Sequence, residues 1–125
     1  MNVVITLPRD LINKIINGEK WYEMRKSFPY RFREGNGVFV IEKGTDRVRC
    51  FFRVLDFISI ETCEARACAA RLGVSVEYVN NYCKNAKRIY LWKIGKVTAL
   101  SNCRRSNLGV KSNPQNFVYT HFDVL

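Results

Sequence analysis

Histidine is nearly absent from this sequence, and cysteine lacks the spacing that metal sites need. His121 is the only histidine, which excludes a histidine-rich metal centre and argues against a Ser-His-Asp triad. The five cysteines are odd in number, and no pair has C-x-x-C spacing. Because these features argue against a disulfide framework and a zinc site, we expect reduced, mainly structural thiols, no metal and no organic cofactor.

Long apolar runs are also missing. No stretch approaches the roughly 18–20 apolar residues of a membrane-spanning helix, and residues 1–10 lack a basic leader followed by an apolar segment. We therefore expect no membrane segment, no signal peptide and a cytoplasmic location. Internal repeats and Pro/Gly-rich linkers are lacking as well, so the sequence predicts a single domain over residues 1–125.

Acidic residues are scarce: 11 Asp and Glu stand against 21 Lys and Arg, for a formal net charge of +10. Residues 85–125 hold seven cationic side chains and one acidic one, whereas residues 46–84 hold six and five. A localised basic surface favours a polyanion, so we expect RNA or a nucleotide as the partner. The alternative is a solvated basic face that only aids solubility.

Apolar periodicity and turn residues predict nine elements of secondary structure. In chain order these are strand 2–7, helix 9–18, strand 20–27, strand 37–43, strand 47–60, helix 60–72, helix 76–85, strand 88–100 and strand 116–122. Ser59 and Ser75 are the expected N-caps of the second and third helices. The third should turn Val76, Val79 and Tyr82 or Cys83 inward. This order predicts an α+β fold with a mostly antiparallel, partly closed β-barrel of about six strands and three helices at its ends.

The strand at 20–27 is unusually charged. Strand alternation would place Trp21, Glu23 and Arg25 on one face, and Tyr22 and Met24 on the other. This segment is either a solvated edge strand whose charges discourage aggregation or one wall of a polar site.

Lys20, Glu23 and Arg25 could converge on one cavity if their face of the strand points inward. Such a trio could bind a phosphate or the polar edge of a base, and a lysine with a lowered pKa could act as a base or nucleophile. These three residues are therefore the candidate catalytic set.

A second candidate segment is "SNLGVKSNPQNFVYT" at 106–120, which combines amide, aromatic and cationic side chains. Amides suit the edge of a base, aromatic rings suit stacking, and cations suit phosphates. The alternative is a polar surface loop before a half-buried strand. The expected nucleic-acid-binding residues are Lys20, Arg25, Lys26, Lys93, Arg104, Arg105, Lys111, Gln115, Asn116 and Tyr119.

These two segments carry a family resemblance. "LINKIINGEKWYEMRKSFP" resembles the signature of the ASCH family in the PUA-like superfamily, in which a helix precedes G-x-K and E-x-R. "YLWKIGKV" followed by "SNLGVKSNPQNFVYT" is similar to the closing motif of a prokaryotic and phage-associated subgroup. The resemblance spans most of the chain. It implies a small β-barrel with a nucleic-acid or nucleoside cleft between barrel and helices, lined by Lys20, Glu23 and Arg25.

The resemblance also implies two kinds of catalysis. One branch hydrolyses acetylcytidine with a lysine matched by Lys20, a threonine matched by Glu23 and a further glutamate; another relative cleaves single-stranded RNA. Glu23 departs from this pattern, and Glu42, Glu61 and Glu64 are the candidates for the further glutamate. The hydrolase reading is thus an alternative to simple binding.

Two more alternatives remain open. Residues 64–85 resemble a DNA-binding helix-turn-helix whose second helix would offer Asn80 and Asn81 to duplex DNA, although local charge is nearly balanced and the neighbours are predicted strands. A basic protein-binding inhibitor of a mobile element is the other. No residue argues for it, and the protein partner stays unspecified.

Overall fold

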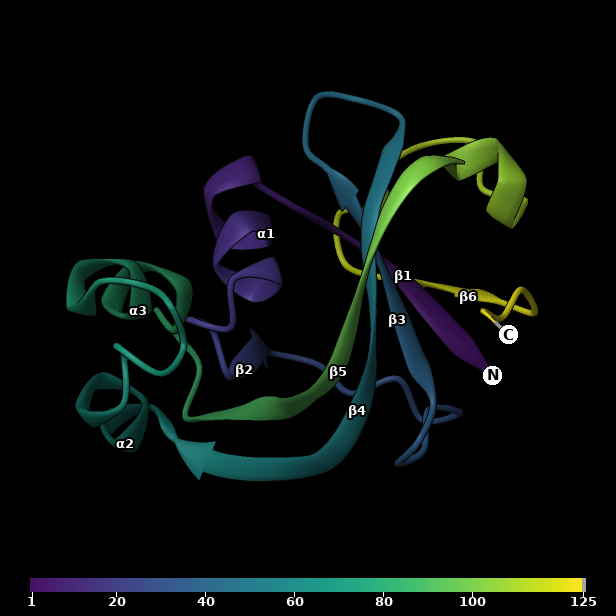
Figure 1. The fold of residues 1–125 in the computed structure, drawn as a ribbon. Coiled ribbons are helices and arrows are strands. Elements are labelled where there is room, and N and C mark those ends of the chain that lie inside the picture. The colour runs from purple at the N-terminus through teal and green to yellow at the C-terminus, as the bar shows by residue number, and fades with distance from the viewer. Residues whose placement is uncertain (125) are drawn as a thin grey trace.

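A computed structural model describes residues 1–124, in which one twisted sheet carries three helices at one side (Figure 1). Its six strands lie in the order β2-β5-β4-β3-β1-β6. The strands are β1 (Asn2–Leu7), β2 (Tyr22–Arg25), β3 (Gly37–Glu42), β4 (Arg47–Glu61), β5 (Arg88–Arg104) and β6 (Val118–Thr120). The helices are α1 (Arg9–Ile16), α2 (Thr62–Ala67) and α3 (Val76–Tyr82), with a 3-10 turn η1 (Arg105–Leu108).

The predicted α+β class and the mostly antiparallel sheet are confirmed. β1 and β3 run parallel, while the other four strand pairs are antiparallel. β4 and β5 are long and curve together under the helices (Figure 1). A Cβ at Gly95 of β5 would stand 2.9 Å from the Arg53 carbonyl oxygen, so the absence of a side chain lets β4 and β5 approach closely there. The barrel is open: no backbone ladder joins edge strands β2 and β6 within residues 1–124.

Side chains span the opening between the two edges. Arg25 on β2 donates from Nη1 to the carbonyl oxygen of Asn116, at 3.1 Å. The Asn116 amide in turn donates to Ser27 Oγ at 2.8 Å. The Tyr119 hydroxyl accepts from the backbone N–H of Arg31 at 3.2 Å. These polar contacts therefore connect the two edges of the sheet, which no backbone ladder joins among the described residues.

The second predicted helix starts later and ends earlier than expected. β4 continues through Glu61, and Glu61 rather than Ser59 caps α2, in a reciprocal pair with Glu64. Ser75 caps α3 as predicted, since its side chain accepts from the Tyr78 N–H. Val76, expected inward, is exposed instead.

The region predicted as a helix-turn-helix forms a cap on one end of the sheet. α2 and α3 pack with β2 and β5 in a cluster of apolar side chains: Met24, Ala65, Ala69, Leu72, Val79, Cys83, Ile89 and Leu91. Because the helices are six and seven residues long and rest on strands, they lack the helical bundle that presents a recognition helix.

The main core lies between α1 and the inner face of the sheet, and it includes Leu11, Ile12, Ile15, Phe52 and Trp92. A third cluster lies on the other face around Phe39 and Phe51. Among the helices of residues 1–124, none has the length and apolar character that crossing a membrane requires.

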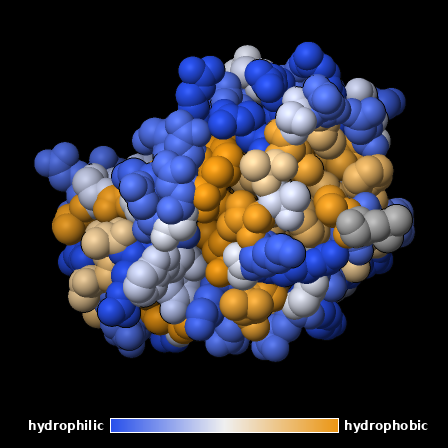
Figure 2. Space-filling view, in the orientation of Figure 1, coloured by the Kyte–Doolittle hydropathy of each residue, from blue (hydrophilic) through white to orange (hydrophobic). Residues whose placement is uncertain are grey.

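The surface is mixed in polarity on the face viewed in Figure 1. Apolar side chains gather near its centre and toward the side of β6, between hydrophilic margins (Figure 2). On the β6 side a hollow of about 510 Å³ is lined by Phe39, Leu100 and Phe122 among other residues.

Gly37 lies under the ring of Phe51 at the start of β3. A Cβ at this position would lie 2.0 Å from Phe51 Cζ, and Phe51 is itself buried. Gly37→Ala should therefore destabilise the fold by about 1–3 kcal/mol through overpacking, measured by urea unfolding.

A double-mutant cycle with Phe51→Leu identifies the cause of this loss. If the ring is the obstacle, Gly37→Ala should cost less in the Phe51→Leu background than in the wild type. Equal costs in both backgrounds would contradict the explanation.

Candidate functional site

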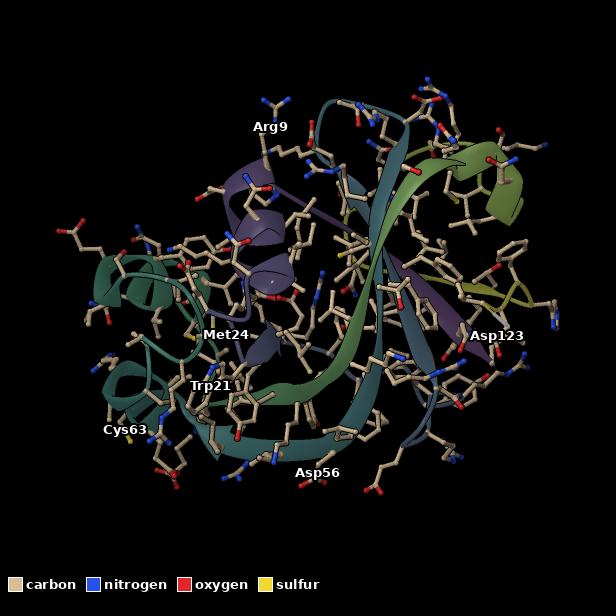
Figure 3. All side chains as sticks on the ribbon, viewed as in Figure 1. Arg9, Trp21, Met24, Asp56, Cys63 and Asp123 are labelled. Carbon is tan, nitrogen blue, oxygen red and sulfur yellow. The ribbon has the colours of Figure 1, made fainter. Side chains whose placement is uncertain are left out.

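A cavity of about 590 Å³ opens between β2, α3, the start of α1 and the loop before β6. Its lining residues are Thr6, Leu7, Pro8, Leu11, Lys20, Glu23, Met24, Arg25, Lys43, Gly44, Leu72, Val74, Tyr78, Tyr82, Asn113, Pro114 and Gln115. Figure 3 places Met24 beside β2, on the side of the helices, and Arg9 at the outer end of α1.

Lys20, Glu23 and Arg25 form a buried charge cluster on the cavity wall. All three lie within a few per cent of full burial. Glu23 stands between the two cations, with Oε1 3.5 Å from Lys20 Nζ and Oε2 2.9 Å from Arg25 Nε. The carboxylate compensates both cations, which burial would otherwise penalise. The cluster keeps one net positive charge.

Arg25 is fixed from several directions and still keeps unused donors. Its Nη1 bonds the Asn116 carbonyl oxygen, and its guanidinium carbon lies 5.9 Å from the centre of the Trp92 ring. The 2.9 Å contact with Glu23 is an ion pair without hydrogen-bond alignment, so Nε and Nη2 both lack a hydrogen-bond acceptor among the described residues. Buried donors without acceptors are costly to stability.

Lys20 is held by the turn that follows α2. Its Nζ donates to the Leu72 carbonyl oxygen, and the neighbouring Lys14 amine donates to the Gly73 carbonyl oxygen at 2.9 Å. Burial lowers the pKa of Lys20 below its ordinary value, although the Glu23 carboxylate acts in the opposite direction. Desolvation of the Lys20 amine thus outweighs its ion pair with Glu23.

Two tyrosines of α3 form an aromatic wall of the cavity, which the sequence analysis did not single out as a site. Tyr78 and Tyr82 are one helical turn apart, and their rings stack with centroids 6.1 Å apart and planes 8° apart. Burial raises the pKa of Tyr82 to about 12. Lys26 Nζ lies 4.8 Å from the centre of the Tyr82 ring. The i, i+4 spacing of the tyrosines was the available signal.

Strand β2 is buried on both faces, which corrects part of the predicted alternation. Glu23 and Arg25 line the cavity. Met24 also reaches the cavity, and it packs against the helical cap. Trp21, predicted to share the face of Glu23, lies before the strand and is 54% exposed. Its ring instead lies 5.5 Å from the guanidinium of Arg71.

The remaining predicted binding residues divide by position. Gln115 lines the cavity, and Asn116 contributes its carbonyl oxygen to Arg25. Arg105 supports the same loop by donating to Asn113 Oδ1 at 2.8 Å. Arg104 is paired with Asp46 at 2.6 Å. The predicted residues outside the cavity lining are Lys26, Lys93, Arg104, Arg105, Lys111, Asn116 and Tyr119.

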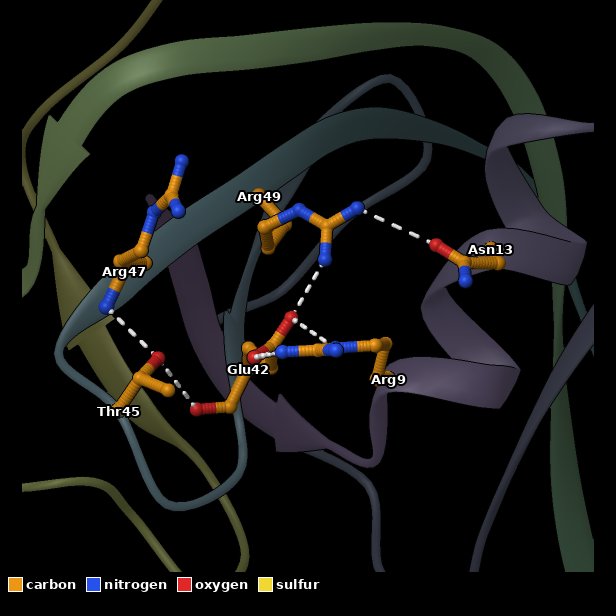
Figure 4. Close-up of polar contacts among 6 residues, drawn as sticks. All are labelled: Arg9, Asn13, Glu42, Thr45, Arg47 and Arg49. Carbon is orange, nitrogen blue, oxygen red and sulfur yellow. Dashed lines mark hydrogen bonds and ion pairs between the residues drawn. The ribbon is translucent and has the colours of Figure 1, made fainter.

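The three glutamates considered as a further acid do not line the cavity. Glu61 and Glu64 are exposed and cap α2. Glu42 is buried between two arginines, as Figure 4 shows. Within the described part of the chain, no group of three His, Cys, Asp or Glu side chains gathers as a metal site would require.

Comparison with known proteins identifies the fold. No protein-family model and no curated protein matches the sequence. The crystal structure of ASCH from Zymomonas mobilis aligns with a TM-score of 0.85 over 96% of this chain and 87% of its own, at 13% identity. A mutant of that protein gives 0.84 over 96% and 90%, at 13% identity.

The hypothetical protein PH0355 is similar over a smaller region. It aligns with a TM-score of 0.53 over 73% of this chain and 94% of its own, at 16% identity. Identities this low establish the fold alone. The predicted resemblance is thus confirmed at the level of architecture: this chain has the fold of the ASCH domain.

Proposed function

We propose that the protein binds RNA or a nucleotide, with one base in the cavity beside Lys20, Glu23 and Arg25. The observation that carries this proposal is the union of a buried charge cluster and an aromatic wall in one cavity of about 590 Å³. A base has an edge of donors and acceptors and two apolar faces. Lys20 and Arg25 supply donors and Glu23 supplies an acceptor, while Tyr78 and Tyr82 supply apolar surface.

Charge supports the same ligand class. The chain carries a net charge of +10, and the cations that border the cavity exceed the acids. Lys43 is an exposed cavity residue, and Gln115 offers both a donor and an acceptor at the loop. A nucleotide would bring a phosphate to the basic mouth and a base to the interior.

The tyrosine wall gives a direct test. Tyr78 is 41% exposed and lines the cavity, whereas Tyr30 is 70% exposed and lies outside it. Removing a stacking ring costs about 1–3 kcal/mol per base, so Tyr78→Ala should weaken binding of single-stranded RNA by about 5- to 150-fold. Tyr30→Ala is the matched control, and fluorescence anisotropy is the measurement.

Equal affinities of the Tyr78→Ala and Tyr30→Ala variants would contradict the placement of a base in the cavity. Wild-type protein that binds neither single-stranded RNA nor mononucleotides at low salt would overturn the proposal altogether.

A hydrolase acting through Lys20 is the second candidate, because burial lowers the pKa of this amine beside the cavity. A lysine that loses its proton more readily is a better nucleophile or base. Turnover of acetylcytidine or RNA by the wild type, and its loss in a folded Lys20→Met variant, would support it. Wild-type protein without turnover would contradict it. The DNA-binding and inhibitor alternatives stay predictions.

A further inference from the structure

A cluster of cations lies around the β3–β4 turn, whose residues Lys43 and Gly44 line the cavity. We call Arg9, Lys43, Arg47 and Arg49 the basic rim. Arg9 and Arg49 pair with one carboxylate, Glu42 (Figure 4). The four cations and Glu42 together carry three net positive charges. Arg9 projects outward from α1 (Figure 3), and its side chain is 73% exposed.

Glu42 orients two of these cations without using all their donors. Arg9 donates from Nε and Nη2 to the two carboxylate oxygens, at 3.3 and 3.2 Å. Arg49 donates from Nη1 to Oε1 and from Nη2 to Asn13 Oδ1, the latter at 3.2 Å. Hydrogen bonds from Arg9 keep the pKa of Glu42 below its ordinary value, so the carboxylate stays ionised. Arg9 Nη1 and Arg49 Nε are left over for an outside acceptor.

Arg47 has no acidic partner in the described part of the chain and faces a like charge. It lies directly opposite Arg104 in the β4–β5 ladder, a pairing that is unfavourable on its own. Asp46 compensates Arg104 at 2.6 Å, while the side chain of Arg47 has no hydrogen-bond partner in Figure 4. An added anion would relieve this repulsion.

The rim is continuous with the cavity. Lys43 and Gly44 of the β3–β4 turn line the cavity, as does Pro8, which immediately precedes Arg9. The Lys43 backbone N–H donates to the Leu7 carbonyl oxygen at 2.9 Å, which ties the turn to the end of β1. A nucleic-acid strand that leaves the cavity at this turn would pass directly over the basic rim.

We propose that the basic rim binds the phosphates next to the base held in the cavity, so that the ligand is single-stranded RNA rather than a free nucleotide. This inference rests on the proposed function. A single strand suits the geometry, because one nucleotide can enter the cavity while its neighbours stay outside. Free cations at the mouth then contact the backbone, which positions the strand without reading its sequence.

The experiment compares ligand lengths. Affinities are measured for uridine monophosphate and for di-, tetra- and octanucleotides of uridine, at several salt concentrations. The test variant is Arg9→Gln/Arg47→Gln, which leaves Arg49 on Glu42. The matched control is Arg66→Gln/Lys84→Gln, which removes the same charge from exposed positions on the helical cap.

In the wild type and the control, affinity should rise from the mononucleotide to the tetranucleotide. In the rim variant this gain in affinity should be about tenfold smaller. The slope of log K against log salt should be shallower by about 1.4, because two phosphate contacts are lost. Mononucleotide binding should weaken much less than tetranucleotide binding, since a mononucleotide carries one phosphate and the variant keeps Lys43, the rim residue that lines the cavity.

Other outcomes overturn the inference. If wild-type protein binds the mononucleotide as tightly as the longer ligands, the rim proposal fails while the proposed function stands. Equal length and salt dependence in rim and control variants, or a preference for duplex DNA, would also refute it. Absence of all nucleotide binding would end both proposals.

Discussion

Replacing Glu23 by glutamine should destabilise the fold by about 3–5 kcal/mol, because the change leaves two buried cations without their shared carboxylate. Lys20 and Arg25 are 3% and 6% exposed, and Glu23 is the acid in contact with both. Glutamine retains the size of the side chain, so the loss reports charge rather than packing. Urea unfolding at neutral pH measures it.

The loss of stability caused by Glu23→Gln should also depend on pH. Burial already lowers the folded-state pKa of Lys20 below 10.5, and loss of Glu23 removes the group that raises it. Between the folded and unfolded pKa values the unfolded chain binds more protons, so stability rises with pH. Glu23→Gln widens the pH range between the folded and unfolded pKa values of Lys20. The stability that the variant loses relative to the wild type should therefore become smaller toward pH ~10.

Glu34→Gln is the matched control, since Glu34 is exposed and forms no ion pair among the described residues. It should unfold within about 0.5 kcal/mol of the wild type. A Glu23→Gln protein as stable as this control would show that the three charged groups do not depend on one another.

Trp92→Ala should cost about 3–5 kcal/mol, the range for removing a large aromatic side chain from a core. Trp92 is fully buried, and its ring centroid lies 5.2 Å from that of Phe32 and 6.4 Å from that of Phe57. It also lies beside Arg25 and pairs with Glu23 in the β2–β5 ladder. The resulting cavity would therefore loosen both the core and the packing of Arg25 and Glu23.

Trp92→Phe distinguishes the loss of aromatic packing from the loss of the indole N–H, because it removes the N–H and keeps a ring. Trp92 Nε1 is buried without an acceptor among the described residues, so replacing it removes an unpaired donor as well as volume. The phenylalanine variant should lose less than half of what the alanine variant loses. Similar unfolding midpoints for the two variants, measured in urea, would contradict a packing role for the indole.

Local patterns account for the elements that the sequence analysis placed well. The apolar stripe of Leu11, Ile12 and Ile15 predicted α1, and Ser75 marked the start of α3. The second helix was misplaced because β4 extends to Glu61, where pairing with Arg88 of β5 continues the strand. Local capping signals could not reveal this, since a ladder to a distant strand outweighs a nearby serine.

The candidate site was predicted in part. Strand alternation and the G-x-K, E-x-R pattern pointed to Lys20, Glu23 and Arg25, and the structure brings these three together on one cavity. Tyr78 and Tyr82 were not predicted as a pair, because the apolar pattern of their helix was used only to predict which residues turn toward the core. Lys93, Lys111 and Tyr119 were included on charge or ring type alone, and they lie outside the cavity lining.

The sequence by itself determined the α+β order of elements, the excess of positive charge and the identity of the charged trio. Periodicity, composition and short motifs are local properties of the chain, so they can be read without coordinates. Only the tertiary structure decided that the trio is buried and that two tyrosines and Lys43 line the same cavity. These features depend on contacts between distant residues, such as Arg25 with Asn116, 91 positions apart, and no local pattern encodes such a contact.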